Sequence, residues 1–165
     1  MKTVLFVCTG NTCRSPMAET VMEELVDDYP SIRGHVRAES AGTMACEGAD
    51  ITDFAQEALE EKGMDASRHR ARQITPEIAE EADLILTMGA QHLDELEAIC
   101  PDAWDKAHTL KGYVANIDGF PGDEGYDIAD PFREPLEVYE ECLEEITAAV
   151  KLLLERLARE AEQQD

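Results

Sequence analysis

The sequence is poor in basic residues. Only 14 lysines and arginines stand against 37 aspartates and glutamates, which gives a formal net charge of −23 at pH 7. A chain this negative repels the phosphates of nucleic acids and of anionic membranes. We therefore expect no nucleic acid and no membrane among its partners. So broad an acidic surplus also suits a solvated surface at high salt.

Long hydrophobic runs and paired cysteines are missing as well. No apolar stretch approaches the roughly 18 residues that a membrane span needs, and the N-terminus lacks a signal-peptide pattern. The cysteines follow neither a disulfide framework nor a zinc spacing with the four histidines. They are Cys8, Cys13, Cys46, Cys100 and Cys142. These absences predict a cytoplasmic protein with reduced thiols and no metal.

The pattern of elements predicts the fold class. A chain of 165 residues with 44% hydrophobic residues has the size of one domain, 1–165. Strands are expected at 3–8, 36–40, 84–88 and 107–110, and helices at 15–29, 51–62, 76–82, 91–99 and 136–157. Strands that alternate with helices predict an α/β fold, an open twisted parallel sheet of about four strands with helices on both faces. Ligands of such folds bind at the carboxyl ends of the strands.

The segment 8–16, Cys-Thr-Gly-Asn-Thr-Cys-Arg-Ser-Pro, joins the first strand to the first helix. A tight loop here aims backbone N–H groups and the positive end of a helix at one point, which makes a cradle for an anion. Gly10 and Asn11 tolerate the left-handed backbone that such a cradle needs. Ser15 and Pro16 are expected as the N-cap and the first residue of the helix.

Two side chains of this segment carry chemistry. Arg14 can donate two hydrogen bonds to one oxyanion. Cys8, on the floor of the cradle, is expected as a thiolate nucleophile for phosphoryl groups. A buried structural cysteine beside a solvated arginine is the alternative, which the surrounding strand, Gly-Asn pair and Ser-Pro pair disfavour.

The segment 8–16 resembles the active-site loop of low-molecular-weight protein tyrosine phosphatases and of their relatives, the bacterial protein-arginine phosphatases. Further segments that resemble the family are 40–43 (Ser-Ala-Gly-Thr), 69–75 (His-Arg-Ala-Arg-Gln-Ile-Thr), 82–86 (Ala-Asp-Leu-Ile-Leu) and 130–132 (Asp-Pro-Phe). The resemblance implies a flavodoxin- or Rossmann-like sheet and a two-step reaction without cofactor or metal. Cys8 would attack phosphorus to form a phosphocysteine, Arg14 would hold the equatorial oxygens, and water would then release inorganic phosphate.

The resemblance also implies roles for neighbouring residues. Ser15 would stabilise the thiolate, and Asn11, Ser40 and His69 would fix the loop. The remaining residues expected to bind phosphate are Thr9, Gly10, Thr12 and Cys13.

The resemblance further implies redox sensitivity. A reversible disulfide between Cys8 and Cys13 would protect the nucleophile from over-oxidation, whereas a small buried side chain is the alternative for Cys13. Cys46, Cys100 and Cys142 are expected as packing residues.

The leaving group needs a proton. The loop of residues 118–131 offers four aspartates as donors, and composition does not choose among them: Asp118, Asp123, Asp127 and Asp130. The resemblance selects Asp130, which is followed by Pro131.

The fourth residue after the nucleophile bears on the substrate. Tyrosine phosphatases of the family usually carry a bulky aliphatic residue there, whereas this chain has Thr12, as the arginine phosphatases do. Threonine can shape the floor for a planar guanidinium and place the hydrolytic water, with Phe132 as an apolar wall. The resemblance therefore favours phosphoarginine in proteins, with phosphotyrosine as the alternative and a cognate protein kinase as an expected partner. Residues 133–135 depart from the glycines that relatives often have.

Other functional classes fit less well. An arsenate reductase would need closely spaced downstream cysteines, but Cys46 and Cys100 stand far apart. A non-catalytic anion-binding or phosphocarrier module would need no acid. A nucleotide binder would show a Gly-x-Gly-x-x-Gly pattern after the first strand, which is absent.

Overall fold

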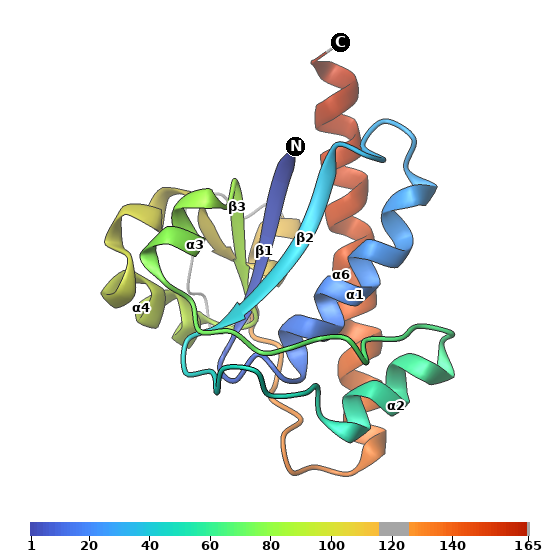
Figure 1. Cartoon of the computed structure of the whole chain (residues 1–165). Coiled ribbons are helices and arrows are strands. Elements are labelled where there is room, and N and C mark those ends of the chain that lie inside the picture. The colour runs from blue at the N-terminus through green and yellow to red at the C-terminus, as the bar shows by residue number, and fades with distance from the viewer. Residues whose placement is uncertain (116–125, 165) are drawn as a thin grey trace.

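A parallel sheet of four strands forms the centre of the molecule (Figure 1). The computed structural model describes residues 1–115 and 126–164. The strands are β1 (Lys2–Cys8), β2 (Val36–Gly42), β3 (Leu84–Thr87) and β4 (Ala107–Thr109), in the order β2-β1-β3-β4. The first strand is thus central, and its carboxyl end lies between those of β2 and β3. The expected fold class is confirmed.

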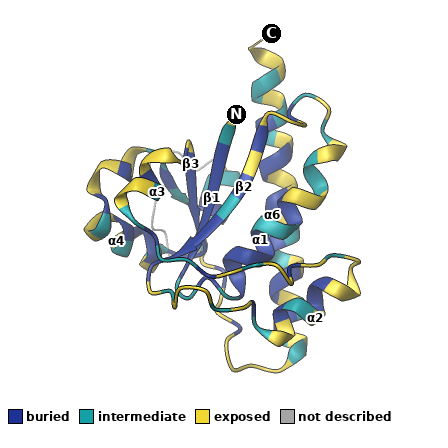
Figure 2. Cartoon of the chain, in the orientation of Figure 1, coloured by how far each residue is buried: buried dark blue, intermediate teal, exposed yellow. Residues whose placement is uncertain are grey.

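Helices cover both faces of this sheet. They are α1 (Arg14–Leu25), α2 (Asp53–Glu61), α3 (Pro76–Glu81), α4 (Ala90–Ile99), α5 (Leu110–Val114) and α6 (Leu136–Gln163), with 3-10 turns η1 (Val26–Asp28) and η2 (Pro101–Lys106). Val4 and Phe6 of β1 pack with α1, α2 and α6, whereas Leu5 and Val7 pack with α3 and α4. Figure 2 shows β1 buried along nearly its whole length, which explains its unbroken apolar sequence. In the described part of the chain, no helix has the length and apolar character required to cross a bilayer.

Two expected details of the elements are wrong, and some elements were not expected. Ser15 is not the N-cap of α1, because the helix begins at Arg14 after Cys13, and the Ser15 hydroxyl contacts the Cys8 sulfur instead. The last strand ends at Thr109, whose side chain accepts a hydrogen bond from the Gly112 N–H and so caps α5. The sequence analysis also missed α5 and η2.

The end of α2 is a Schellman motif. Gly63 adopts φ +78°, its N–H bonds the Glu60 carbonyl, and the Met64 N–H bonds the Leu59 carbonyl. No heavy atom lies within 4 Å of a Cβ at position 63, so only the backbone conformation calls for glycine.

We predict that Gly63→Ala lowers the free energy of unfolding by about 1 kcal/mol, because an L side chain is strained in this conformation. Gly63→Asn, the control, should cost less, since asparagine tolerates the left-handed region. Urea denaturation measures both. An alanine variant as stable as the parent would contradict the prediction.

Candidate functional site

The loop of residues 8–15 is held by the end of β2. The Thr43 N–H donates to the Cys8 carbonyl (3.0 Å) and the Met44 N–H to the Thr9 carbonyl (2.9 Å). A Cβ on Gly42 would lie 2.4 Å from the Thr9 carbonyl oxygen. Glycine at 42 is therefore what lets β2 approach the loop this closely.

A chain of hydrogen bonds leads to the buried Cys8 sulfur. Its Sγ lies 2.9 Å from Ser15 Oγ, and Asn11 Nδ2 donates to that same oxygen (2.9 Å). Because Asn11 supplies a proton to Ser15 Oγ, the hydroxyl can turn its own proton toward the sulfur. That arrangement lets the Ser15 hydroxyl donate a hydrogen bond to the Cys8 sulfur.

Asn11 connects this chain to the rest of the protein. It is fully buried with φ +57°, and its Nδ2 also donates to Ser40 Oγ (2.9 Å). Its Oδ1 accepts from the Arg72 N–H (2.9 Å), and its carbonyl oxygen lies 2.6 Å from His69 Nε2. A carbonyl only accepts, so His69 Nε2 carries the proton; burial lowers the pKa of His69.

The structure thus brings together Asn11, Ser40 and His69, and it adds a residue that the sequence analysis missed. Glu19 Oε1 accepts the Ser40 hydroxyl at 2.5 Å. Burial raises the pKa of this carboxyl. Glu19 follows Ser15 by four residues on α1, so helical spacing alone could have placed it on the same face.

Arg14 faces the other wall of the site. Its Nη1 donates to the Ile128 carbonyl (2.9 Å), and its Nη2 lies 3.5 Å from Asp130 Oδ2. Its Nε is buried and has no hydrogen-bond partner among the described residues. A buried guanidinium donor left unpaired is costly, so this atom is suited to an incoming oxyanion.

Asp130 is the aspartate that the structure places against Arg14. Its carboxylate is 46% exposed and accepts from the Phe132 N–H (3.1 Å). Asp127 points elsewhere, because its Oδ1 accepts the Ala90 N–H at the start of α4 (2.8 Å). Asp118 and Asp123 lie outside the described residues. Geometry therefore favours the aspartate that the resemblance selected.

The four cysteines other than Cys8 are free thiols that differ in their burial. Cys13 Sγ donates to Asp130 Oδ1 (3.7 Å), and burial, followed by the nearby Cys8 and Asp130, raises the pKa of Cys13 to about 12. Cys100 and Cys142 are buried, as expected of packing residues, but Cys46 is exposed, so the packing role expected for it is wrong.

Thr12 and Phe132, the two residues expected to set the substrate, lie on different segments of the chain. Thr12 is half-buried in the loop, and its carbonyl accepts the Thr52 N–H (2.8 Å). Phe132 is 53% exposed, with the Arg133 guanidinium 5.3 Å from its ring centroid. Arg133 has φ +69°, a left-handed conformation that glycine adopts more readily than other residues.

His92 is a second residue that the sequence analysis did not place in the site. It lies in the first turn of α4, 2% exposed, with Nε2 3.0 Å from Thr9 Oγ1. Burial, followed by the charge of Arg14, lowers the pKa of His92 to about 4. Its position after β3 was the available signal, because the carboxyl ends of parallel strands meet.

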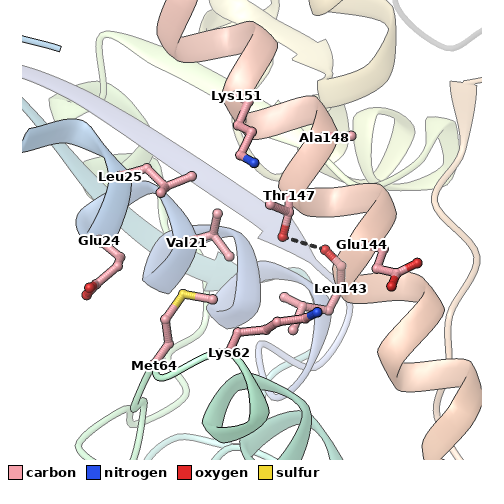
Figure 3. A pocket seen from close by; sticks show the side chains of 10 residues that line it. All are labelled: Val21, Glu24, Leu25, Lys62, Met64, Leu143, Glu144, Thr147, Ala148 and Lys151. Carbon is pink, nitrogen blue, oxygen red and sulfur yellow. Dashed lines mark hydrogen bonds between the residues drawn. The ribbon is translucent and has the colours of Figure 1, made fainter. Parts of the chain in front are cut away.

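A pocket of about 430 Å³ lies away from all these residues. Figure 3 shows it between α1, α6 and the turn after α2, where apolar Val21, Leu25 and Leu143 line it together with Lys62 and Lys151. Cavity volume alone would have pointed away from the loop of residues 8–15.

Comparisons with known proteins agree on a family. Residues 3–163 match the model of the family "Low molecular weight phosphotyrosine protein phosphatase". A protein of Geobacillus stearothermophilus named "Protein-arginine-phosphatase" is 40% identical over 95% of this chain and 97% of its own length. A protein of Ralstonia nicotianae named "Probable low molecular weight protein-tyrosine-phosphatase EpsP" is 37% identical over the same shares.

Solved structures agree with these sequence matches. The YwlE arginine phosphatase from Geobacillus stearothermophilus superposes with a TM-score of 0.87 at 38% identity, covering 100% of this chain and 98% of that one. A second YwlE structure, a cysteine-to-serine mutant with a phosphorylated active-site serine, gives a TM-score of 0.83 at 35% identity, covering 94% and 95%.

The buried His92 predicts a pH effect on stability. Its pKa is about 4 in the folded state against an ordinary 6.5, so the unfolded chain binds the proton first as the pH falls. Stability contributed by neutral His92 is present above pH 6.5 and is lost as the pH falls toward 4. When the pH is lowered from 7.5 to 5, we expect the free energy of unfolding of the parent to fall by about 2 kcal/mol more than that of His92→Gln. Urea denaturation at both pH values measures it; parallel changes in the two proteins would contradict it.

Proposed function

This chain belongs to the low-molecular-weight phosphotyrosine protein phosphatase family, and we propose that its substrate within that family is phosphoarginine in proteins. It is a cysteine-dependent protein phosphatase, a hydrolase that acts through a phosphocysteine. The observation that carries the assignment of Cys8 as nucleophile is its contact with Ser15, whose oxygen already accepts a proton from Asn11.

The first step transfers the phosphoryl group to sulfur. The Cys8 thiolate attacks phosphorus, a P–S bond forms, and the bond from phosphorus to the leaving nitrogen breaks. Asp130 donates its proton to that nitrogen, so arginine leaves as a neutral guanidine that solvent then protonates. Arg14 and the backbone N–H groups of residues 9–14 bind the equatorial oxygens, whose charge they stabilise.

The second step regenerates the enzyme. The Asp130 carboxylate takes a proton from water, the water oxygen attacks phosphorus, and the S–P bond breaks. The electron pair returns to Cys8 sulfur, where the Ser15 hydroxyl stabilises the thiolate, and inorganic phosphate leaves. In this scheme Asp130 acts first as an acid and then as a base.

The choice of arginine over tyrosine rests on Thr12. A relative named as an arginine phosphatase is 40% identical to this chain, and one named as a tyrosine phosphatase is 37% identical. Overall similarity therefore does not decide between the two substrates. A threonine leaves more room on the floor than a bulky aliphatic residue, and its hydroxyl can orient the water of the second step. Phe132 would form an apolar wall for the guanidinium plane.

The cellular setting is part of the same proposal. Free thiols at Cys8 and Cys13 suit the reducing cytoplasm, where phosphorylated proteins are the partners and a cognate protein kinase would supply them. A reversible Cys8–Cys13 disulfide would protect the nucleophile during oxidation.

The role of Asp130 is testable by Asp130→Asn. We expect formation of the phosphocysteine to slow by about 10²- to 10⁴-fold, the usual contribution of a general acid, with little loss of affinity for inorganic phosphate. Single-turnover kinetics on a phosphoarginine peptide measures the first quantity and competitive inhibition by phosphate the second. Equal single-turnover rates in variant and parent would remove Asp130 from the mechanism.

The substrate is tested by kcat/KM on matched phosphoarginine and phosphotyrosine peptides, with Cys8→Ser as the blank. We expect a strong arginine preference. Thr12→Val keeps the shape and removes the hydroxyl, and should lower kcat on phosphoarginine by about tenfold, the worth of one hydrogen bond.

A tyrosine preference would keep the mechanism and overturn the substrate. No turnover of either peptide in reducing buffer at high salt would instead favour an anion-binding module.

A further inference from the structure

We propose that the first turn of α4 is a shared anchor that positions Asp130 relative to the Cys8 loop, with His92 and Asp127 as its positioning residues. The inference rests on the proposed function, because it acts through the acid Asp130. It adds two residues that touch neither the nucleophile nor Arg14 by any hydrogen bond described above.

One contact of the anchor reaches the phosphate-binding loop. His92 Nε2 lies 3.0 Å from Oγ1 of Thr9, the residue that directly follows the nucleophile Cys8. His92 is buried, and its Nδ1 has no partner in the described part of the chain. The bond to Thr9 is therefore the polar contact that orients this ring, and it ties the loop to α4.

The other contact reaches the segment that carries Asp130. The N-cap of α4 is Gly89, which has no side chain with which to cap the helix. Asp127 supplies the missing acceptor, since its Oδ1 receives the Ala90 N–H at 2.8 Å, where the helix dipole also favours a carboxylate. A Cβ on Gly89 would lie 3.2 Å from that same oxygen, so glycine permits the close approach.

A backbone bond extends this second contact to Arg14. The Ile128 N–H donates to the Met88 carbonyl (2.8 Å), and the Ile128 carbonyl accepts from Arg14 Nη1 (2.9 Å). Asp130 follows two residues later. The end of β3 and the start of α4 thus hold the acid's segment, and the same turn of helix holds Thr9.

The consequence is a fixed separation between acid and nucleophile. Proton transfer requires the donor within hydrogen-bond reach of the leaving atom, and a displacement of about 1 Å can cost on the order of 10²-fold in rate. Asp130 is half exposed, with 46% of its side chain accessible. Its position therefore depends on the bonds on either side of it along the chain.

The anchor is tested with two substrates that differ in their need for an acid. Phenyl phosphate releases a basic phenolate that requires a proton, whereas p-nitrophenyl phosphate releases a stable anion. We expect Asp127→Ala to slow single-turnover phosphorylation by about tenfold more on phenyl phosphate than on p-nitrophenyl phosphate. Asp127→Asn, which keeps the acceptor oxygen, should recover most of the loss.

Two further variants keep the test independent of folding defects. Gly89→Ala pushes a Cβ toward the Asp127 carboxylate from the helix side, at a backbone φ of −160° that any residue adopts. This variant should also slow single-turnover phosphorylation more on phenyl phosphate than on p-nitrophenyl phosphate, but by a smaller factor than Asp127→Ala. Asp94→Ala, an exposed carboxylate on the next turn of α4, is the matched control and should leave both rates unchanged.

The contact between His92 and Thr9 is tested by substitution of His92. His92→Leu should weaken inhibition by inorganic phosphate, and His92→Gln, which keeps a hydrogen-bonding group, should largely restore it. Both effects are read as inhibition constants on p-nitrophenyl phosphate.

The outcomes separate the anchor from the proposed function. The Asp127→Ala loss should disappear in an Asp130→Asn background, because the two residues act as one unit. Equal losses on both substrates, or losses that add to those of Asp130→Asn, would overturn the anchor alone. A parent protein that turns over neither the aryl phosphates nor a phosphoarginine peptide would overturn the proposed function, and the inference with it.

Discussion

Asn11 makes four hydrogen bonds from a fully buried position in the left-handed backbone region. Its side chain and carbonyl join Ser15 of α1, Ser40 of β2, and both His69 and the Arg72 N–H of the segment 69–73. Because an unpaired buried polar group costs about 1–3 kcal/mol, the segments 40–43 and 69–73 are held to the loop that surrounds Cys8. The conformation of the anion cradle is therefore maintained from behind, by residues that do not touch the substrate.

The electrostatics of the site contrast with those of the whole chain. The protein carries −23 formal charges, yet the loop that follows Cys8 contains the guanidinium of Arg14, which contacts Asp130. Burial lowers the pKa of both His69 and His92 and so disfavours their charged forms. In the proposed function, a phosphoryl dianion is bound by Arg14, by backbone N–H groups and by the start of α1. Interactions at such short range are weakly screened by salt, unlike those of the acidic surface.

The order of the strands explains why so many segments meet at one end of the sheet. The central strand β1 has β2 on one side and β3 on the other, so the residues that follow each strand surround Cys8. Gly42 extends β2 to the back of the loop, and α4 begins directly after β3. The acid's segment, which follows much later in the chain, closes the site by bonding to the end of β3 and to Arg14.

Local sequence patterns predicted the four strands, the longer helices and the reactive loop. These features are local, because apolar periodicity sets strands and helices, and Cys8 and Arg14 occur within one short turn. Even there, Ser15 was assigned to the helix cap, since local capping preference says nothing of a sulfur seven residues earlier. Composition did not choose between Asp130 and Asp127, which are three residues apart in one acidic loop. The resemblance selected Asp130, and the tertiary structure shows how the two differ, because Asp130 faces Arg14 whereas Asp127 faces α4. Glu19, His92 and the Arg72 N–H likewise joined the site through contacts across 21 to 83 positions of sequence. Hydrogen bonds between distant segments depend on how the sheet orders its strands, and no short pattern in the chain encodes them.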